Sequence, residues 1–301
     1  MDLWIPITIA AAFLQNVRSA MQKHLKGVMG TTGATFVRFG FGVPFAVAFV
    51  AFLHLVVGYP LPRVNTAFLA WCGLGGIAQI VATFLLIHLF SFRNFAVGTA
   101  YSRTEPAQAA IFGLLFLGET VSAGVVTAIA ISVVGVMLIS VARSEFTWAT
   151  LFTSVLGRNA LIGLTSGTAF GIAAVAYRAA SLALGGPNFM MQAAVTLAAV
   201  IVLQTLVMLV WMLWKDRAEI GRIGQAWKPS LFVGLVGASA SFGWFMAMTL
   251  QQAAVVKSLA QIEMLFTFAS SVFVFRERIN RMEIAGCALI VSGILTLLAF
   301  R

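Results

Sequence analysis

Long apolar runs alternate with short polar segments along the whole chain. A helix that crosses a lipid bilayer needs roughly 20 mostly apolar residues, and the sequence offers ten such runs. The runs are too long, and alternate too little, to be the strands of a membrane β-barrel. The pattern therefore predicts an all-α integral membrane protein with ten transmembrane helices, over residues 3–24, 33–57, 66–90, 95–117, 121–142, 159–182, 187–214, 229–250, 253–275 and 282–300.

The segments that separate these runs carry turn or charge signals. Examples are GYPLPR (58–63), RSEFTW (143–148), GGPN (185–188) and KDRAEIGRIG (215–224). None of them is long enough to join independently folded domains, and no segment has the pattern of a soluble domain.

An internal repeat connects the two halves of the chain. A shift by 158 residues superimposes Ala96-Val97 on Ala254-Val255, Phe84 on Phe242, Glu105 on Glu263, Glu119 on Glu277, Val133 on Val291 and Gly135 on Gly293. Five spans per repeat is an odd number, so the second copy must enter the membrane upside down. We expect residues 1–150 to form a first five-helix repeat and residues 151–301 to form a second, inverted one, which is an architecture that transporters use.

Composition agrees with a membrane protein and narrows its partners. The chain is 61% hydrophobic and 9% charged, whereas a soluble domain carries about 25% charged residues. The net charge of +10 is better explained by membrane topology and lipid headgroups than by nucleic acid. We therefore expect the lipid bilayer and a small-molecule substrate as partners, and no nucleic acid. Because both halves lie in one chain, a monomer could suffice.

The distribution of basic residues predicts the orientation in the membrane, because cytoplasmic loops are enriched in lysine and arginine. One side would carry only Arg63 and Arg301. The loops after the odd-numbered spans carry Lys23, Lys26, Arg93, Arg143, Arg158, Lys215, Arg217, Arg222, Lys228, Arg276, Arg278 and Arg281. We therefore expect both termini to face outward. The acidic start, MDLWIPITIA, predicts that the first apolar run is retained as a helix rather than cleaved as a signal peptide.

A polar stripe runs along the first predicted span. Gln15, Arg18, Ser19 and Gln22 are spaced i, i+3, i+4 and i+7, so they share one face of a helix. Because polar groups that face lipid are costly, this face either lines a cavity for water and substrate or forms hydrogen bonds between packed helices.

The stretch YSRTEPAQAAIFGLLFLGET (101–120) places charge in the fourth predicted span. In a continuous helix Tyr101, Glu105 and Gln108 share a face, and Arg103 lies about 200° from Glu105, so the two charges are not expected to pair. This face could bind the charged ends of a zwitterion or carry a proton-sensitive carboxylate. Alternatively, Glu105 forms a buried ion pair that fixes helix packing, with Arg18, Arg38 or Arg103.

Other spans contribute further candidates. The predicted substrate cavity also includes Gln79, Thr83, Ser241, Trp244 and Gln261, and the candidates for proton coupling are Glu105, Glu263 and His88. For each of these side chains the alternative is ordinary packing or a position at the membrane interface.

Enzymatic chemistry is not indicated. The sequence contains no HExxH, nucleophile elbow, P-loop or paired acidic metal site. Cys72 and Cys287 both lie inside apolar runs, where cysteine is a small packing residue. We therefore expect no catalytic residues, no cofactor and no metal.

Two segments carry a family resemblance. AIFGLLFLGETVSAGVVTAIAISVVGVMLI (110–139) and its second copy FASSVFVFRERINRMEIAGCALIVSGILTLL (268–298) resemble the drug/metabolite transporter superfamily, in its EamA-like ten-span branch. Pro106 on the fourth span and Arg38 early in the second also fit that family. The second copy departs from the motif, with Met264 in place of the proline and Arg276 in place of the glycine. In length and span count the chain is most similar to bacterial amino acid exporters of the YddG type.

The resemblance implies a secondary carrier of the bacterial inner membrane that works by alternating access between two halves. Its substrates would be small metabolites, most plausibly amino acids including aromatic ones. The alternatives are efflux of drugs, nucleobases or nucleotide sugars, or a flippase or enzyme that acts on lipid headgroups. A channel is a further alternative, although nothing in the sequence resembles a selectivity filter.

Overall fold

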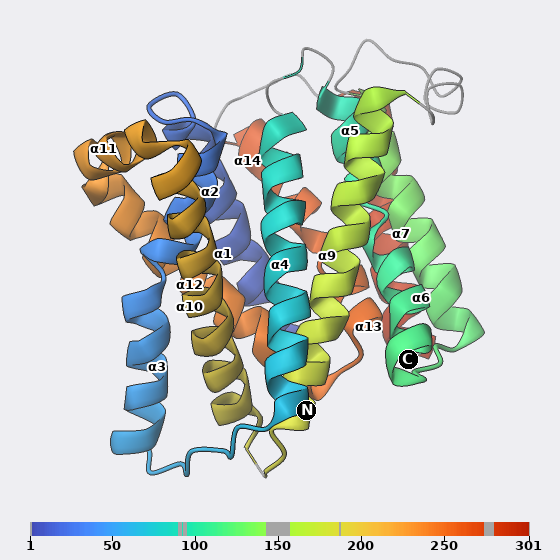
Figure 1. Ribbon diagram of the computed structural model, residues 1–301. Helices are drawn as coiled ribbons and strands as arrows, with labels where there is room; N and C mark the ends of the chain where they lie inside the picture. Colours follow the sequence, from blue (N-terminus) through green and yellow to red (C-terminus); the bar gives the residue numbers. More distant parts are fainter. Residues whose placement is uncertain are drawn as a thin grey trace. The chain divides into compact units, whose positions relative to one another are not determined.

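The computed structural model describes residues 2–89, 92, 95–142, 157–186, 188–273 and 280–300 (Figure 1). Within these ranges the secondary structure is helical and contains no strand, so the predicted all-α class is confirmed. The helices are α1 Trp4–Leu25, α2 Thr31–Gly40, α3 Val43–Leu55, α4 Thr66–Leu89, α5 Phe95–Ser102, α6 Glu105–Leu117, α7 Ala123–Ala142, α9 Arg158–Ala183, α10 Phe189–Lys215, α11 Arg217–Gln225, α12 Trp227–Leu250, α13 Ala253–Leu259, α14 Ile262–Phe273 and α15 Arg281–Phe300.

Seven segments of the described chain are long and apolar enough to cross a membrane. One of them, Thr31–Leu55, contains both α2 and α3. The predicted count of ten spans is therefore not confirmed. The other three predicted spans fall on α1, which carries the polar stripe, and on two runs that the structure divides into shorter helices.

Three predicted spans are interrupted. The run 33–57 breaks at Phe41-Gly42, the run 95–117 at Arg103-Thr104 and the run 253–275 at Ala260-Gln261. Proline explains the first two, since Pro44 and Pro106 each occupy the first or second position of the helix that follows, where the missing N–H costs nothing. The third break occurs without a proline. The continuous helix on which the shared face of Tyr101, Glu105 and Gln108 depended is therefore wrong.

The predicted separators differ from one another. Residues 58–63 are not helical, and neither are Gly185, Gly186 and Asn188, whereas residue 187 lies outside the described residues. Gly58, Gly185 and Gly186 have positive φ, where L-residues other than glycine are strained. The segment 215–224 was predicted as a loop, but most of it is helix α11. Its pattern of Ile220 and Ile223 among charges is amphipathic, and Ile223 is buried. The separator 143–148, and Arg93, Arg143, Arg276, Arg278 and Glu277, lie outside the described residues.

The internal repeat is visible in the positions of the helices. Helices α2, α5 and α7 begin at residues 31, 95 and 123, and α10, α13 and α15 begin 158 residues later, at 189, 253 and 281. The same offset superimposed the residue pairs in the sequence. The two halves therefore share one order of helices, to which the second half adds α11.

The chain divides into two compact units that each combine parts of both repeats. Unit 1 comprises Met1–Ile80 and Ala173–Gln251, and unit 2 comprises Val81–Ile172 and Gln252–Arg301. The boundaries fall inside α4, inside α9 and between α12 and α13.

In unit 1, α10 packs against α2 and α3, and α12 packs against α1. Residues early in the α2–α3 segment contact the middle of α10, and later residues contact its start. A Cβ built on Gly42 would meet Ile201, whereas Leu53 clusters with Met191, nearer the start of α10. The repeat-equivalent segments of this unit are therefore antiparallel.

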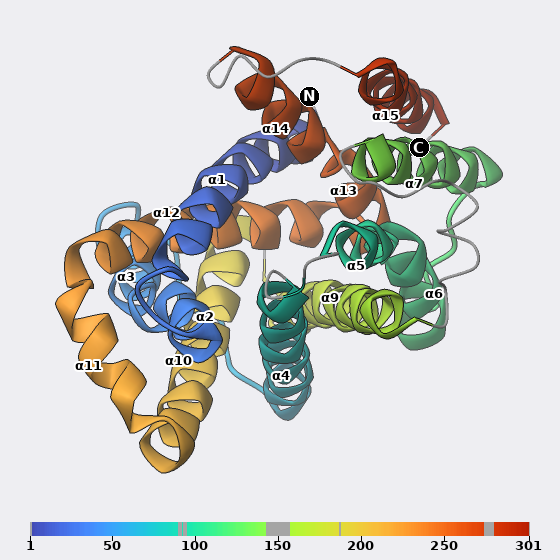
Figure 2. The same cartoon turned by 90° about the horizontal axis from the view of Figure 1, so that it is seen from above.

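In unit 2, α7 and α15 lie side by side (Figure 2). Their backbones approach closely because glycine faces glycine: a Cβ built on Gly286 would lie 2.7 Å from the carbonyl oxygen of Gly135. Small residues permit this packing where no hydrophobic effect drives helices together. Gly124 contacts Phe300 at the other end of the pair, so these repeat-equivalent helices also run antiparallel.

This close approach predicts that Gly286→Ala destabilises the protein. The added methyl group would collide with the carbonyl oxygen of Gly135 and with the side chain of Ile139, and such overpacking costs about 1–3 kcal/mol. We expect a lower apparent melting temperature for the purified protein in detergent. Gly73→Ala is the matched control, because a Cβ there meets no atom within 4 Å. Equal stability of the two variants would contradict the prediction.

Candidate functional site

Unit 2 contains two interrupted helices, α5–α6 and α13–α14, and the interruptions are equivalent. At the first, the backbone N–H of Arg103 donates to the carbonyl of Ala100 over 3.1 Å. At the second, the N–H of Gln261 donates to the carbonyl of Ser258 over 3.2 Å. Both hydrogen bonds join residues three positions apart, which is the 3₁₀ pattern of a tightened turn. The two turns are themselves separated by the offset of the repeat.

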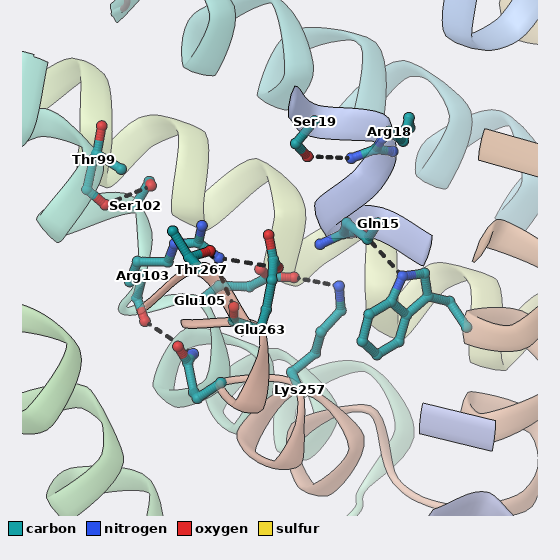
Figure 3. A network of polar contacts seen from close by, with 12 residues as sticks. Gln15, Arg18, Ser19, Thr99, Ser102, Arg103, Glu105, Lys257, Glu263 and Thr267 are labelled. Atoms are coloured by element: carbon teal, nitrogen blue, oxygen red, sulfur yellow. Dashed lines mark hydrogen bonds and ion pairs between the residues drawn. The ribbon is translucent and has the colours of Figure 1, made fainter. Parts of the chain in front are cut away.

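Charged side chains at the two interruptions form crossed ion pairs (Figure 3). The carboxylate of Glu105, at the start of α6, lies 2.8 Å from the ammonium group of Lys257 on α13. The guanidinium group of Arg103 donates over 3.3 Å to the carboxylate of Glu263, in the first turn of α14. Each glutamate at the start of a half-helix is thus neutralised by a cation from the other repeat.

The side chains of these ion pairs are largely buried, so each charge depends on its partner. The side chain of Glu263 is 6% exposed, and those of Glu105 and Lys257 are 18% and 14% exposed, whereas Arg103 is 27% exposed. The positive end of each half-helix also favours a carboxylate in its first turn. Loss of one partner would leave an uncompensated charge in a low-dielectric environment. The alternative of a packing ion pair for Glu105 thus has a concrete partner, although that partner is Lys257 and not an arginine.

Two glutamines flank the charges. The amide nitrogen of Gln108 donates to the hydroxyl of Thr104 over 2.8 Å, and that of Gln261 points at the carbonyl of Arg103 over 3.5 Å. The Oε1 atoms of both glutamines are buried and accept no hydrogen bond within the described chain. Each break therefore carries one buried acceptor that is open to a donor.

The polar stripe of α1 lies in unit 1, where part of it joins helices together. The indole N–H of Trp244 on α12 donates to Gln15 over 3.0 Å (Figure 3). The amide of Gln22 donates to the carbonyl of Ala34 over 2.8 Å, and Arg18 donates to Ser19 over 3.4 Å. For Gln15 and Gln22 these contacts are the interhelical hydrogen bonds of our alternative interpretation. A role of the stripe in a cavity stays a prediction.

A small pocket lies within unit 1. Of the predicted residues it includes Gln79 and Ser241, and its full lining is Arg38, Phe39, Gln79, Leu197, Val200, Ile201, Gln204, Ser241 and Phe245. It has room for about one water-sized group. Behind it, the hydroxyl of Tyr177 lies 2.9 Å from Gln79 Oε1 and 2.9 Å from the carbonyl of Gly75. The amide of Gln204 donates to the same Oε1 over 2.9 Å.

Tyr177→Phe should therefore destabilise unit 1. The substitution removes the buried hydroxyl of Tyr177, which is 2% exposed, and with it the hydrogen bonds to Gly75 and Gln79, which costs about 1–3 kcal/mol. The expected result is a fall in the apparent melting temperature, measured in detergent. Tyr59→Phe, at a half-buried tyrosine near Leu53, provides the control. A Tyr177→Phe variant that melts with the unmodified protein would show that this network adds no stability.

The remaining predicted residues have mixed surroundings. Thr83 and Tyr101 are buried in unit 2, on α4 and α5. His88 stacks on Phe84, with 6.2 Å between ring centroids, and meets the ring of Phe92 edge-on at 5.0 Å. An aromatic enclosure of this kind is compatible with packing, and a proton-coupling role for His88 stays a prediction.

Sequence reasoning missed one residue of these arrangements and the partners of two others. Gln204 was not identified at all; Lys257 and Tyr177 are polar and aromatic residues of predicted spans, but their partners Glu105 and Gln204 were not predicted. A signal existed for Gln204, which is the central amide of the apolar helix α10. No signal in the sequence connects Gln204 to Tyr177, because the pairing depends on how α9 and α10 pack.

Comparison with known proteins gives a family and a fold. The model of the EamA-like transporter family matches residues 2–141 and again residues 158–299. One solved crystal structure matches 100% of this chain and 98% of its own, with a TM-score of 0.71 and 18% sequence identity. At that identity the likeness concerns the fold alone. No curated protein matches the sequence significantly.

Proposed function

Because the chain belongs to the EamA-like transporter family, we propose that it is a secondary carrier that moves small metabolites by alternating access. The family consists of membrane transporters and not of enzymes, and the apolar helices agree with a multi-pass membrane protein. The driving force would be the substrate gradient or exchange with protons.

The observation that carries this proposal is the pair of interrupted helices in unit 2. Carriers with internal repeats bind substrates and ions at discontinuous helices, where half-helix ends present charge and free backbone groups. Here both breaks occur at equivalent positions, and each places a glutamate at the start of a half-helix. Charge buried at such a point is a candidate for a functional site.

We further propose that the two repeats are inverted. Antiparallel packing of α2–α3 with α10, and of α7 with α15, is what an inverted repeat requires. The predicted arrangement has both termini outward, in the inner membrane of a bacterium, and a monomer that contains both repeats. A cysteine-accessibility assay at positions near the two termini would test the orientation.

Amino acids, including aromatic ones, are the substrates that we favour, as in exporters of the YddG type. The predicted cavity combines cationic, amide and aromatic side chains, which suit a zwitterion with an apolar side chain. The residues proposed for it remain Gln15, Arg18, Ser19, Gln22, Gln79, Thr83, Tyr101, Glu105, Gln108, Ser241, Trp244 and Gln261, with Glu105, Glu263 and His88 as candidates for proton coupling.

Efflux of drugs, nucleobases or nucleotide sugars is the second candidate. The crossed pairs argue against cationic drugs, because both glutamates of the breaks are already neutralised. A lipid-headgroup flippase or enzyme would need a titratable cluster near one membrane interface, and co-purification of a lipid would favour it.

Transport by purified protein tests the proposal. In proteoliposomes we expect saturable counterflow of labelled phenylalanine, with competition by other amino acids and not by nucleobases. An imposed proton gradient should change the rate only if the carrier exchanges protons, and Glu105→Gln should then remove that dependence. Empty liposomes are the control. The absence of flux for every amino acid would exclude the substrate, and flux without saturation would indicate a channel.

A further inference from the structure

The pocket of unit 1 is lined by Arg38, two glutamines, a serine and apolar side chains, with no acidic residue in its lining. We infer that this pocket is the subsite that binds the carboxylate of the substrate, through Arg38. The inference rests on the proposed function, since it names the chemical class of the solute carried. It predicts that a carboxylate is required for recognition and that an ammonium group is not.

Arg38 is positioned for this role by burial. It is 5% exposed near the end of α2, and its guanidinium carbon lies 5.4 Å from the centroid of the Phe39 ring. A guanidinium group is always charged and presents a planar fork of donors that matches a carboxylate in two parallel hydrogen bonds. A lysine would offer only a point charge.

A second buried arginine lies beside the first. A Cβ built on Gly237 of α12 would lie 3.3 Å from Cδ of Arg18 and 3.8 Å from Cγ of Arg38. Arg18 is itself 7% exposed. The aliphatic stems of the two arginines therefore both lie beside Gly237 of α12. Such a pair favours an oxyanion and disfavours a cation.

The orientation of the Gln79 amide also favours an anion in the pocket. Gln79 Oε1 accepts hydrogen bonds from both Tyr177 and Gln204, so the Gln79 amide is oriented with its oxygen engaged. The NH₂ end of Gln79 is left as a donor. Together with the guanidinium group of Arg38, it offers hydrogen-bond donors to an anion.

The rest of the lining is apolar. Leu197, Val200, Ile201 and Phe245 complete it, and the ring of Phe245 stacks on Tyr177 with 4.5 Å between centroids. Because the pocket has room for about one water-sized group, it would hold one oxygen of the carboxylate, and the rest of the solute would extend beyond the pocket.

Three ligands that share an aromatic part and differ in their charged groups distinguish recognition of the carboxylate from recognition of the ammonium group. We would measure binding to the full chain in nanodiscs by thermal shift and by displacement of labelled phenylalanine. We expect phenylalanine and 3-phenylpropionate to bind, and phenethylamine to bind at least about tenfold more weakly. Arg38→Gln should reduce binding of both carboxylates at least about tenfold, and Arg38→Lys should restore part of it. Arg217→Gln, at an exposed arginine of the same unit, is the matched control and should bind normally.

A second variant covers the case in which Arg38→Gln does not fold. Gly237→Ala keeps both charges and adds a methyl group whose three nearest atoms belong to the flexible stems of Arg18 and Arg38, so it should weaken carboxylate binding without loss of folding. Equal binding of phenethylamine and 3-phenylpropionate, or unchanged binding by Arg38→Gln, would overturn the inference. Flux with the opposite ligand preference would reject the subsite and keep the carrier, whereas carboxylate binding without any flux would reject the carrier and keep the subsite.

Discussion

Lys257→Glu is expected to destabilise the protein strongly, and the exchanged variant Glu105→Lys/Lys257→Glu is expected to recover most of the loss. The single change places two carboxylates where the structure has an ion pair at 2.8 Å between largely buried side chains. Removal of one partner of a buried pair costs about 3–5 kcal/mol, and like charges add repulsion. The exchanged variant restores opposite charges, although its lysine would lie at a helix start that favours an acid.

A double-mutant cycle on thermal denaturation in detergent, with yield of folded protein as a second readout, measures this coupling. Glu263→Gln gives an internal comparison. We expect it to cost less, because its partner Arg103 is 27% exposed and can be solvated when its pair is lost. If the exchanged variant is as unstable as the sum of the single variants, the pair does not contribute through its charges.

The helical architecture was largely predictable from the sequence. Apolar runs of bilayer length located most helices, and the offset between Glu105 and Glu263 anticipated the shared helix order. These signals are local or repeated, so they survive without knowledge of packing. The family resemblance agrees with the match of the family model over both halves.

The interruptions were only partly predictable. Two of the breaks lie next to prolines, Pro44 and Pro106, but Ala260-Gln261 breaks the helix without a proline or glycine. A run of apolar residues has the same pattern whether the helix continues or turns, so hydropathy cannot distinguish them. The faces assigned to Tyr101 and Glu105 depended on continuity and changed with the break.

Partners were the least predictable feature. The polar residues of the apolar runs could be identified as important because burial without a partner is costly. Their partners come from other segments of the chain. Lys257 lies 152 residues beyond Glu105, and Gln204 of α10 forms a hydrogen bond with Tyr177 of α9. The choice between Lys257 and an arginine depends on tertiary packing, about which a single sequence carries no information.

Glu219→Ala is expected to destabilise unit 1 by about 3 kcal/mol, because this glutamate caps a helix that is far away in the sequence. Glu219 lies on α11 and is 1% exposed. Its carboxylate accepts from the backbone N–H groups of Gly30 over 2.8 Å and of Gly33 over 3.1 Å, at the start of α2, and it also pairs with Arg222. The residue before α2 provides no side-chain cap of its own. Removal of Glu219 leaves buried donors without an acceptor at the positive end of a helix.

The matched control is a glutamate that caps a helix locally. Glu283 accepts from the N–H of Asn280 over 3.0 Å at the start of α15, so Glu283→Ala should cost about 1 kcal/mol, as for an ordinary cap. Gly33→Ala tests the same contact from the other side, because a Cβ there would collide with the carboxylate of Glu219. Apparent melting temperatures in detergent would rank Glu219→Ala and Gly33→Ala below Glu283→Ala. Since α2 carries Arg38, both variants should also weaken carboxylate binding, whereas Glu283→Ala should not; the reverse ranking would mean that α11 is not what fixes the start of α2.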